Sequence, residues 1–172
     1  GGTGIVYRAT QLATERACAV KLLFGEMATD RQMSERFARE AKAASKIQHP
    51  NVVRIIDHVR QASGVTYLVM DYIEGRTLKD IIDEEAPLST ERVMAMGSQI
   101  AAGLAAAHRQ GYVHRDLKPG NIMVSDGGPE VLRILVFGIV ASLQAADTKE
   151  RLTKTGFIVG TPTYMAPEQI DP

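Results

Sequence analysis

Apolar and polar positions follow two different periods in the first half of the chain. Four short runs rich in β-branched and apolar residues, bounded by turn residues, are predicted as strands: 5–10, 17–23, 52–56 and 65–73. Between them, apolar side chains in residues 31–48 recur every three or four positions, which predicts an amphipathic helix that ends before Pro50. The first half is therefore predicted to be a strand-rich unit with one helix.

The second half has mainly helical periodicity. Thr77 is a candidate cap for a short helix, and Ser89 is one for a longer helix that Gly111 would stop. The predicted buried stripe of the longer helix is Val93, Met96, Ile100, Leu104 and Ala107. Two short strands follow, at 122–124 and up to residue 136, and the remainder is expected to be loop. The two units are predicted to join near residues 74–75.

Composition narrows the class of protein. The 172 residues include 45% hydrophobic and 23% charged residues, which is typical of a globular domain. Lys plus Arg and Asp plus Glu each number 20, so a net charge of zero gives no overall attraction to nucleic acid or to an anionic membrane. The uncharged stretch 93–107 is too short to cross a bilayer. The single cysteine, Cys18, excludes an intrachain disulfide, fits a reducing compartment and is expected to be buried.

Three features of the first half are each compatible with a phosphate-binding site and with an ordinary structural role. Gly1, Gly2 and Gly4 precede a strand, as in a loop that binds phosphate through its backbone, but also as in a flexible hairpin tip. Lys21 either reaches a ligand's phosphates or lies in solvent at a sheet edge. Glu40 lies within the apolar stripe of its helix, so it either pairs with a cation such as Lys21 or keeps its carboxylate in water.

A more specific signal is the string His-Arg-Asp-Leu-Lys-Pro-Gly-Asn at residues 114–121. Asp116 is suited to accept a hydroxyl proton, Lys118 to neutralise phosphate charge, and Asn121 to offer an oxygen to a hard cation. His114 is expected to pack as a core residue. With Ala19-Val20-Lys21 and Ala166-Pro167-Glu168, this string resembles the protein kinase family.

The resemblance covers essentially the whole chain and implies an α+β, two-lobed fold. Residues 1–73 would form an antiparallel-sheet small lobe with one helix, lacking the first part of the glycine-rich loop. Residues 74–172 would form an incomplete, mainly helical large lobe up to the activation segment. Because further large-lobe helices of the family are absent, we expect exposed apolar surface and a marginally stable or aggregating chain. The strings HRDLKPGNIM and GTPTYMAPEQ resemble bacterial kinases of eukaryotic type.

The same resemblance implies residue roles. Asp116 would be the catalytic base, Lys118 the γ-phosphate lysine and Asn121 a magnesium ligand. The implied ATP-binding residues are Gly1, Gly4, Val6, Ala19, Lys21, Glu40, Met70, Asp71, Ile73 and Met123. The implied activation segment includes Thr153, Thr155 and Thr161. ATP and Mg²⁺ are the implied cofactors, and protein substrates or signalling partners join ATP as partners. A cytoplasmic location is implied, with membrane anchoring of a longer parent left open.

One departure from the family pattern bears directly on activity. Val136 occupies the position of the aspartate in Asp-Phe-Gly, and a valine side chain offers magnesium no oxygen ligand. Residue 136 also extends the apolar run of the preceding strand. The sequence therefore predicts a Ser/Thr protein kinase domain fragment, in which transfer of the ATP γ-phosphoryl group to Ser or Thr hydroxyls is impaired. The alternative is a pseudokinase that acts as a nucleotide-binding or scaffolding module.

Overall fold

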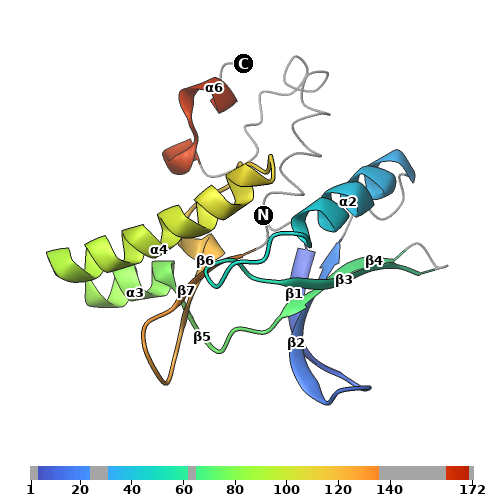
Figure 1. Cartoon of the computed structure of the whole chain (residues 1–172), viewed down its shortest axis with the longest axis horizontal. Helices are drawn as coiled ribbons and strands as arrows, with labels where there is room; N and C mark the ends of the chain where they lie inside the picture. The colour runs from blue at the N-terminus through green and yellow to red at the C-terminus, as the bar shows by residue number, and fades with distance from the viewer. Residues whose placement is uncertain (1–3, 24–30, 62–64, 136–161, 171–172) are drawn as a thin grey trace.

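The computed structural model describes residues 4–23, 31–61, 65–135 and 162–170, which form two antiparallel sheets and their covering helices (Figure 1). The strands are β1 Gly4–Gln11, β2 Arg16–Leu23, β3 Ile55–Arg60, β4 Thr66–Asp71, β5 Gly75–Thr77, β6 Ile122–Ser125 and β7 Leu132–Ile134. The helices are α2 Arg31–Ala44, α3 Leu78–Glu85, α4 Thr90–Arg109 and α6 Pro167–Ile170, with 3₁₀ turns η1 Pro119–Asn121 and η2 Pro162–Tyr164. The first sheet has the order β1-β2-β4-β3 and the second β5-β6-β7. The predicted α+β fold of two lobes is confirmed.

Helix α2 covers one face of the first sheet (Figure 1). Lys21 of β2 lies opposite Leu68 of β4, and Leu68 lies opposite His58 of β3. Because directly opposed residues of a sheet point to the same face, these three side chains share one face. Leu68 is buried there, and the Phe37 ring of α2 lies 5.2 Å from the His58 ring. Lys21 therefore projects from the covered face of the sheet, not from its solvent face.

The segment after α2 differs from its prediction in two respects. The helix ends at Ala44 because its last turn tightens, with the Lys46 and Ile47 amides bonding three residues back. Val52, predicted to begin a strand of the first sheet, instead forms a parallel bridge to Ile134. Its neighbour Val53 donates an amide hydrogen bond of 2.9 Å to the Ile134 carbonyl. Residues 51–53 thus extend the second sheet, and β3 begins only at Ile55.

The large lobe is built on α3, α4 and the second sheet. Thr77 and Asp80 form a reciprocal capping box at α3, and the Ser89 hydroxyl caps α4, as predicted. The shared core is Leu78, Ile81, Met96, Ile122, Val124 and Leu132. Val93, predicted to be buried, is 51% exposed, because it lies in the first turn of α4, where the covering elements do not reach. The periodicity of apolar residues predicts which face of a helix is buried, but it does not predict how much of the helix length the neighbouring elements cover.

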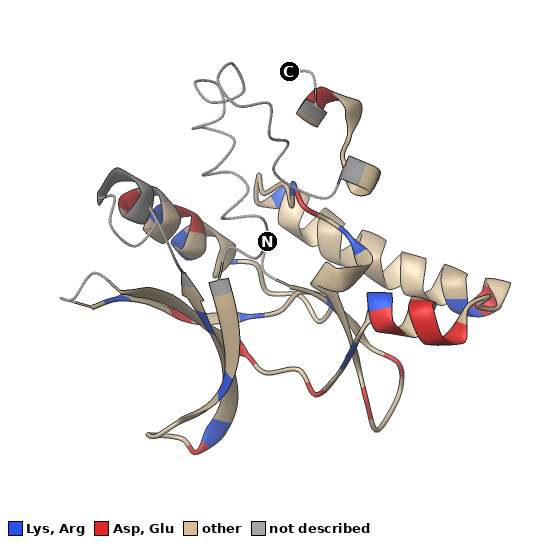
Figure 2. Cartoon of the chain, turned by 180° about the vertical axis from the view of Figure 1, so that it is seen from behind, with Lys and Arg blue, Asp and Glu red and all other residues tan. Residues whose placement is uncertain are grey.

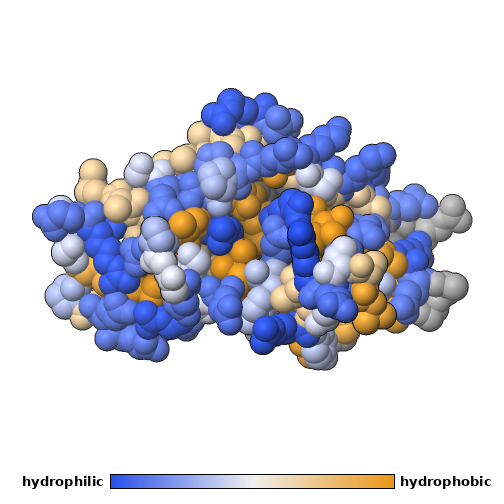
Figure 3. All heavy atoms as spheres, turned by 60° about the horizontal axis from the view of Figure 1, so that its bottom comes forward, coloured by the Kyte–Doolittle hydropathy of each residue, from blue (hydrophilic) through white to orange (hydrophobic). Residues whose placement is uncertain are grey.

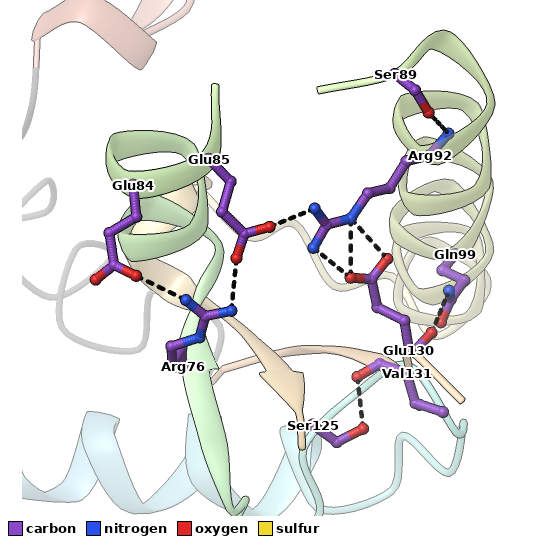
Figure 4. Close-up of polar contacts among 9 residues, drawn as sticks. All are labelled: Arg76, Glu84, Glu85, Ser89, Arg92, Gln99, Ser125, Glu130 and Val131. Carbon is purple, nitrogen blue, oxygen red and sulfur yellow. Dashed lines mark hydrogen bonds and ion pairs between the residues drawn. The ribbon is translucent and has the colours of Figure 1, made fainter. Parts of the chain in front are cut away.

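A network of ion pairs joins the elements of this lobe (Figure 4). Arg92 of α4 contacts Glu85 at 2.6 Å and Glu130, just before β7, at 2.7 Å. Arg76 of β5 contacts Glu85 at 2.6 Å and Glu84 at 2.7 Å. Two arginines thus neutralise part of the acidic surface that α3 presents in Figure 2, and they link α3, α4, β5 and the loop before β7.

The surface is not uniformly polar. Figure 3 shows apolar side chains in patches among hydrophilic ones on the face that it presents. On α4, Met94 is 69% exposed beside Val93. Within the described residues, no helix is both long and apolar enough to cross a membrane.

Candidate active site

The loop between α4 and β6 concentrates polar side chains around one carboxylate. The Lys118 ammonium lies 3.0 Å from Oδ2 of Asp116 and 3.1 Å from Oδ1. The Asn121 amide donates to Oδ2 of Asp116 at 3.0 Å and to its backbone carbonyl at 2.7 Å. The 3₁₀ turn that begins at Pro119 brings Asn121 back to Asp116. The three residues singled out in the sequence are therefore brought together, with the Asp116 side chain held by two neighbours.

His114 connects this loop to the end of β7. Its ring is 3% exposed, as predicted for a core residue. Nδ1 accepts the Asp116 amide at 3.3 Å, and Nε2 lies 3.3 Å from the Leu135 carbonyl, to which it donates when Nδ1 is the acceptor. Burial lowers the pKa of His114, which favours this neutral form. The imidazole thus fixes the loop relative to the residue just before Val136.

Lys21 lies close enough to this loop to interact with its charges. Burial lowers the pKa of Lys21, while the Asp116 carboxylate raises it and the Lys118 ammonium lowers it further. A small-lobe strand thus places a partly desolvated cation near a large-lobe carboxylate. Such an arrangement favours binding of a polyanion, which would neutralise both lysines.

The expected pairing of Lys21 with Glu40 is not found. Among the described residues, no ion pair within 4.0 Å joins them, and the charges that act on Lys21 are those of Asp116 and Lys118. Glu40 instead lies near Tyr112, whose hydroxyl donates to the Glu40 backbone carbonyl at 3.1 Å. Burial raises the pKa of Tyr112, and the Glu40 carboxylate adds to the rise. The position of α2 therefore directs Glu40 toward the large lobe in this structure.

The residues expected around adenine form an apolar cluster where the lobes meet. Ala19 and Met70 are register partners, both are buried, and Val53 packs with them. Ile73 and Leu135 are partly buried against the same cluster. These contacts place small and medium apolar side chains from both lobes in one location, which suits a flat apolar ligand.

Other predicted site residues are placed individually. The Asp71 amide donates to the Arg54 carbonyl at 3.0 Å, and its carboxylate pairs with Arg54. Met123 is half-buried on β6, and Val6 is exposed on β1, which begins at Gly4. The predicted positions that lie outside the described residues are Gly1, Val136, Thr153, Thr155 and Thr161.

Three residues at the site were not singled out in the sequence. Tyr112 reaches Glu40, and Arg8 of β1 stacks over the Tyr72 ring at 5.0 Å. Gln169 donates to the Arg115 carbonyl at 2.8 Å. Only Gln169 has a local signal: Ala-Pro-Glu-Gln places proline at the first helical position and glutamine at the third, a helix-start pattern.

Comparisons with known proteins agree with this geometry. The family described as "Protein kinase domain" matches residues 1–172. The chain is 40% identical over 171 residues to Serine/threonine-protein kinase pkn3 of Myxococcus xanthus, covering 98% of this chain and 31% of that protein. It is 38% identical over 170 residues to Serine/threonine-protein kinase PknL of Mycobacterium tuberculosis, covering 99% and 41%. The chain thus spans less than half the length of these relatives.

Solved structures show the same likeness. The PknI kinase domain of Mycobacterium tuberculosis superposes with a TM-score of 0.71 at 28% identity, covering 81% of this chain and 56% of that one. Rad53 residues 1–466, in complex with AMP-PNP, superposes with a TM-score of 0.77 at 25% identity, covering 99% and 39%. The matches in sequence and in fold both extend through the loop that holds Asp116, and the chain belongs to the protein kinase family.

Proposed function

We propose that this chain is the ATP-binding part of a Ser/Thr protein kinase whose phosphoryl transfer is weakened by Val136. The observation that supports it best is the Asp116 carboxylate, held by Lys118 and Asn121 with the Lys21 ammonium nearby. This set combines an acceptor for a hydroxyl proton with cations for phosphate oxygens. The parent reaction would transfer the γ-phosphoryl group of ATP to a Ser or Thr hydroxyl of a protein substrate.

Each residue has a distinct part in the proposal. The apolar cluster around Ala19 and Met70 would take adenine, and the Lys21 ammonium would bind phosphate oxygens of ATP. The Asp116 carboxylate would orient the substrate hydroxyl and accept its proton, while Lys118 would bind the transferred group. In a cell this reaction belongs in the cytoplasm, where ATP is present and where Cys18 stays reduced.

The residues fit magnesium poorly. Mg²⁺ requires oxygen ligands, and Asn121 supplies one while Val136 supplies none. A bound magnesium ion would neutralise charge on the transferred phosphoryl group. Loss of one oxyanion-hole hydrogen-bond donor in an enzyme costs about 100- to 1000-fold in turnover, and loss of a metal ligand should cost at least as much. We therefore expect nucleotide binding to persist while turnover is low.

A pseudokinase that binds nucleotide as a scaffold is the second candidate. One observation favours it: Val136 itself, whose side chain offers no oxygen ligand to a metal ion. Both candidates predict ATP binding. They differ in whether an aspartate at residue 136 is enough to produce a working enzyme.

The test compares the protein that carries Val136, called the parent in the experiments below, with its Val136→Asp variant. Calorimetry with ATP, with and without Mg²⁺, should show little metal dependence for the parent and tighter, metal-dependent binding for the variant. Phosphorylation of a generic Ser/Thr substrate should rise by about 100-fold or more in the variant. Lys21→Met is the control, because it removes the phosphate-binding cation and should weaken ATP binding in both backgrounds.

The outcomes separate the candidates. Strong activity in both proteins would show that Val136 is compensated. Metal-dependent ATP binding without activity in Val136→Asp would favour the scaffold. Failure of either protein to bind ATP would contradict the proposal as a whole.

A further inference from the structure

The residue before the proposed base has an unusual backbone. Arg115 has φ +63°, the left-handed region that a residue with a Cβ rarely adopts. Such a conformation persists where neighbouring groups hold it in place. Arg115 lies between His114 and Asp116, so its conformation sets the direction in which the Asp116 side chain leaves the chain.

The peptide unit that joins Arg115 to Asp116 is held at both ends. Its N–H, which belongs to Asp116, donates to Nδ1 of the buried His114 at 3.3 Å. Its carbonyl, which belongs to Arg115, accepts from Nε2 of Gln169 at 2.8 Å. Because a peptide unit is planar, two bonds on opposite sides fix its rotation. The bond from Asn121 to the Asp116 carbonyl then holds the following unit.

The orientation of the Gln169 amide is itself fixed. Its Oε1 accepts the Ala166 amide at 3.1 Å, so the donor face of the amide points away toward Arg115. The backbone N–H of Gln169 in turn donates to the Ala166 carbonyl at 2.9 Å. Residues 166–169 are therefore linked by two local hydrogen bonds, and Gln169, 54 residues beyond Arg115 in the chain, presents one aligned donor to the loop.

We propose that Gln169 is a positioning residue for Asp116, which clamps the Arg115 carbonyl and so couples the end of the activation segment to the proposed catalytic loop. This rests on the proposed role of Asp116. Gln169 and Arg115 are both exposed, so water can replace the lost donor in a variant and overall stability changes little. Water cannot fix the rotation of the peptide unit, so the order of the loop depends on Gln169.

The test changes the side-chain hydrogen-bond donor at residue 169. Gln169→Glu retains an acceptor for the Ala166 amide but removes the donor to Arg115, and Gln169→Ala removes both. Gln169→Lys supplies a donor again. Gln48→Glu makes the same chemical change at an exposed glutamine outside the 114–121 loop and is the matched control. All variants are measured in the intact protein.

The first readout needs no turnover. By nuclear magnetic resonance, amide exchange at Asp116 should become about tenfold faster in Gln169→Glu and Gln169→Ala, relative to exchange at the buried Leu68. Gln169→Lys should restore part of the protection, and Gln48→Glu should leave it unchanged. The ratio to Leu68 separates loop opening from general unfolding. An unchanged ratio in Gln169→Glu would overturn the proposal and reduce Gln169 to a cap of α6.

The second readout uses the Val136→Asp background. Gln169→Glu should lower kcat about tenfold with KM for ATP unchanged, because the base is misplaced while the nucleotide site is intact. An unchanged kcat would also overturn the proposal. If Val136→Asp has no activity, the proposed function fails, and the exchange ratio still decides whether Gln169 positions the loop.

Discussion

At the scale of single residues, His58 is a polar group in an apolar location. Its Nε2 is buried and has no hydrogen-bond partner among the described residues, and its ring packs on Phe37. Burial lowers the pKa of His58, and Asp57 only partly opposes this. The unfolded chain therefore takes up a proton near its ordinary pKa of 6.5 while the folded chain resists protonation, so stability is lost as the pH falls below that value.

We predict that His58→Phe reduces the loss of folding stability at acid pH. Phenylalanine keeps a ring against Phe37 and removes the unsatisfied nitrogen. Urea denaturation should show equal or higher unfolding free energy at pH 7.5 and a larger advantage over the parent at pH 5.5. The slope that one histidine adds is at most about 1.4 kcal/mol per pH unit, and His114 contributes with the same sign in both proteins. Identical acid dependence in the two proteins would contradict the prediction.

Individual residues also show how far the sequence could be interpreted. Cys18, expected to be buried, and His114, expected to pack as a core residue, are both buried. The helical stripe includes Glu40, and this residue is half-buried in the structure. The stripe could not tell which neighbour Glu40 meets, because a shift of α2 along the sheet exchanges Lys21 for Tyr112 without changing the periodicity.

At the scale of elements, α4 carries two glycines in different surroundings. A Cβ at Gly97 would meet nothing within 4 Å. A Cβ at Gly103 would lie 2.9 Å from the Asn51 carbonyl oxygen and 3.0 Å from Cδ1 of Ile134. At Gly103, α4 therefore approaches the segment that follows α2, and a side chain at this position would collide with that segment.

These two sites give a matched pair of substitutions. Gly97→Ala should stabilise the protein by about 0.5–1 kcal/mol, since alanine favours helix and has open space. Gly103→Ala should destabilise it by about 1–3 kcal/mol, because backbone must move and the strain exceeds the same gain in helix propensity. Urea denaturation followed by circular dichroism measures both. A stabilising Gly103→Ala would mean that α4 and Asn51 are less tightly packed than the structure shows.

Helices and strands were predicted correctly where they are long enough to show a period or a cap in the sequence. The caps Thr77 and Ser89 and the stop at Gly111, with φ +72°, are where the sequence placed them. The three-residue β5 and the four-residue α6 were missed, because so few positions carry no period. The run at 52–56 was divided between two sheets, since an apolar run gives burial but not the partner strand.

At the scale of the whole molecule, Asn51 joins the segment that follows α2 to α4 and β7. Its side-chain amide donates to Oε1 of Gln99 at 2.9 Å and to the Leu132 carbonyl at 2.8 Å. Its backbone carbonyl accepts the Ile134 amide at 2.9 Å. Gln99 also accepts the Leu132 amide, so α4, β7 and the segment after α2 share one buried polar network. The same segment continues into β3 of the first sheet, so the network holds the connection between α2 and β3 against α4 and β7.

The overall arrangement was predictable only through the family resemblance. Periodicity indicated a strand-rich unit followed by a helical one, but hydrophobic patterning alone does not fix how two such units dock. Asn51 lies in a His-Pro-Asn turn that looks like an ordinary helix stop, and Gln99 interrupts an apolar helix. Each residue is unremarkable alone, and their significance comes from a hydrogen bond across 48 residues of chain.

We predict that Asn51→Ala weakens the docking of the two lobes more than it disturbs either lobe. One buried and one partly buried hydrogen bond are lost, and the Leu132 carbonyl loses a donor, which should cost about 2–4 kcal/mol of unfolding free energy. The Val53 and Ile134 amides, which join the segment after α2 to β7, should lose exchange protection before the β2–β4 amides do. Arg54→Ala is the control, because its ion pair with Asp71 is exposed and should contribute at most about 1 kcal/mol. Equal effects of the two substitutions would show that the lobes are held elsewhere, and the proximity of Lys21 to Asp116 would then need another cause.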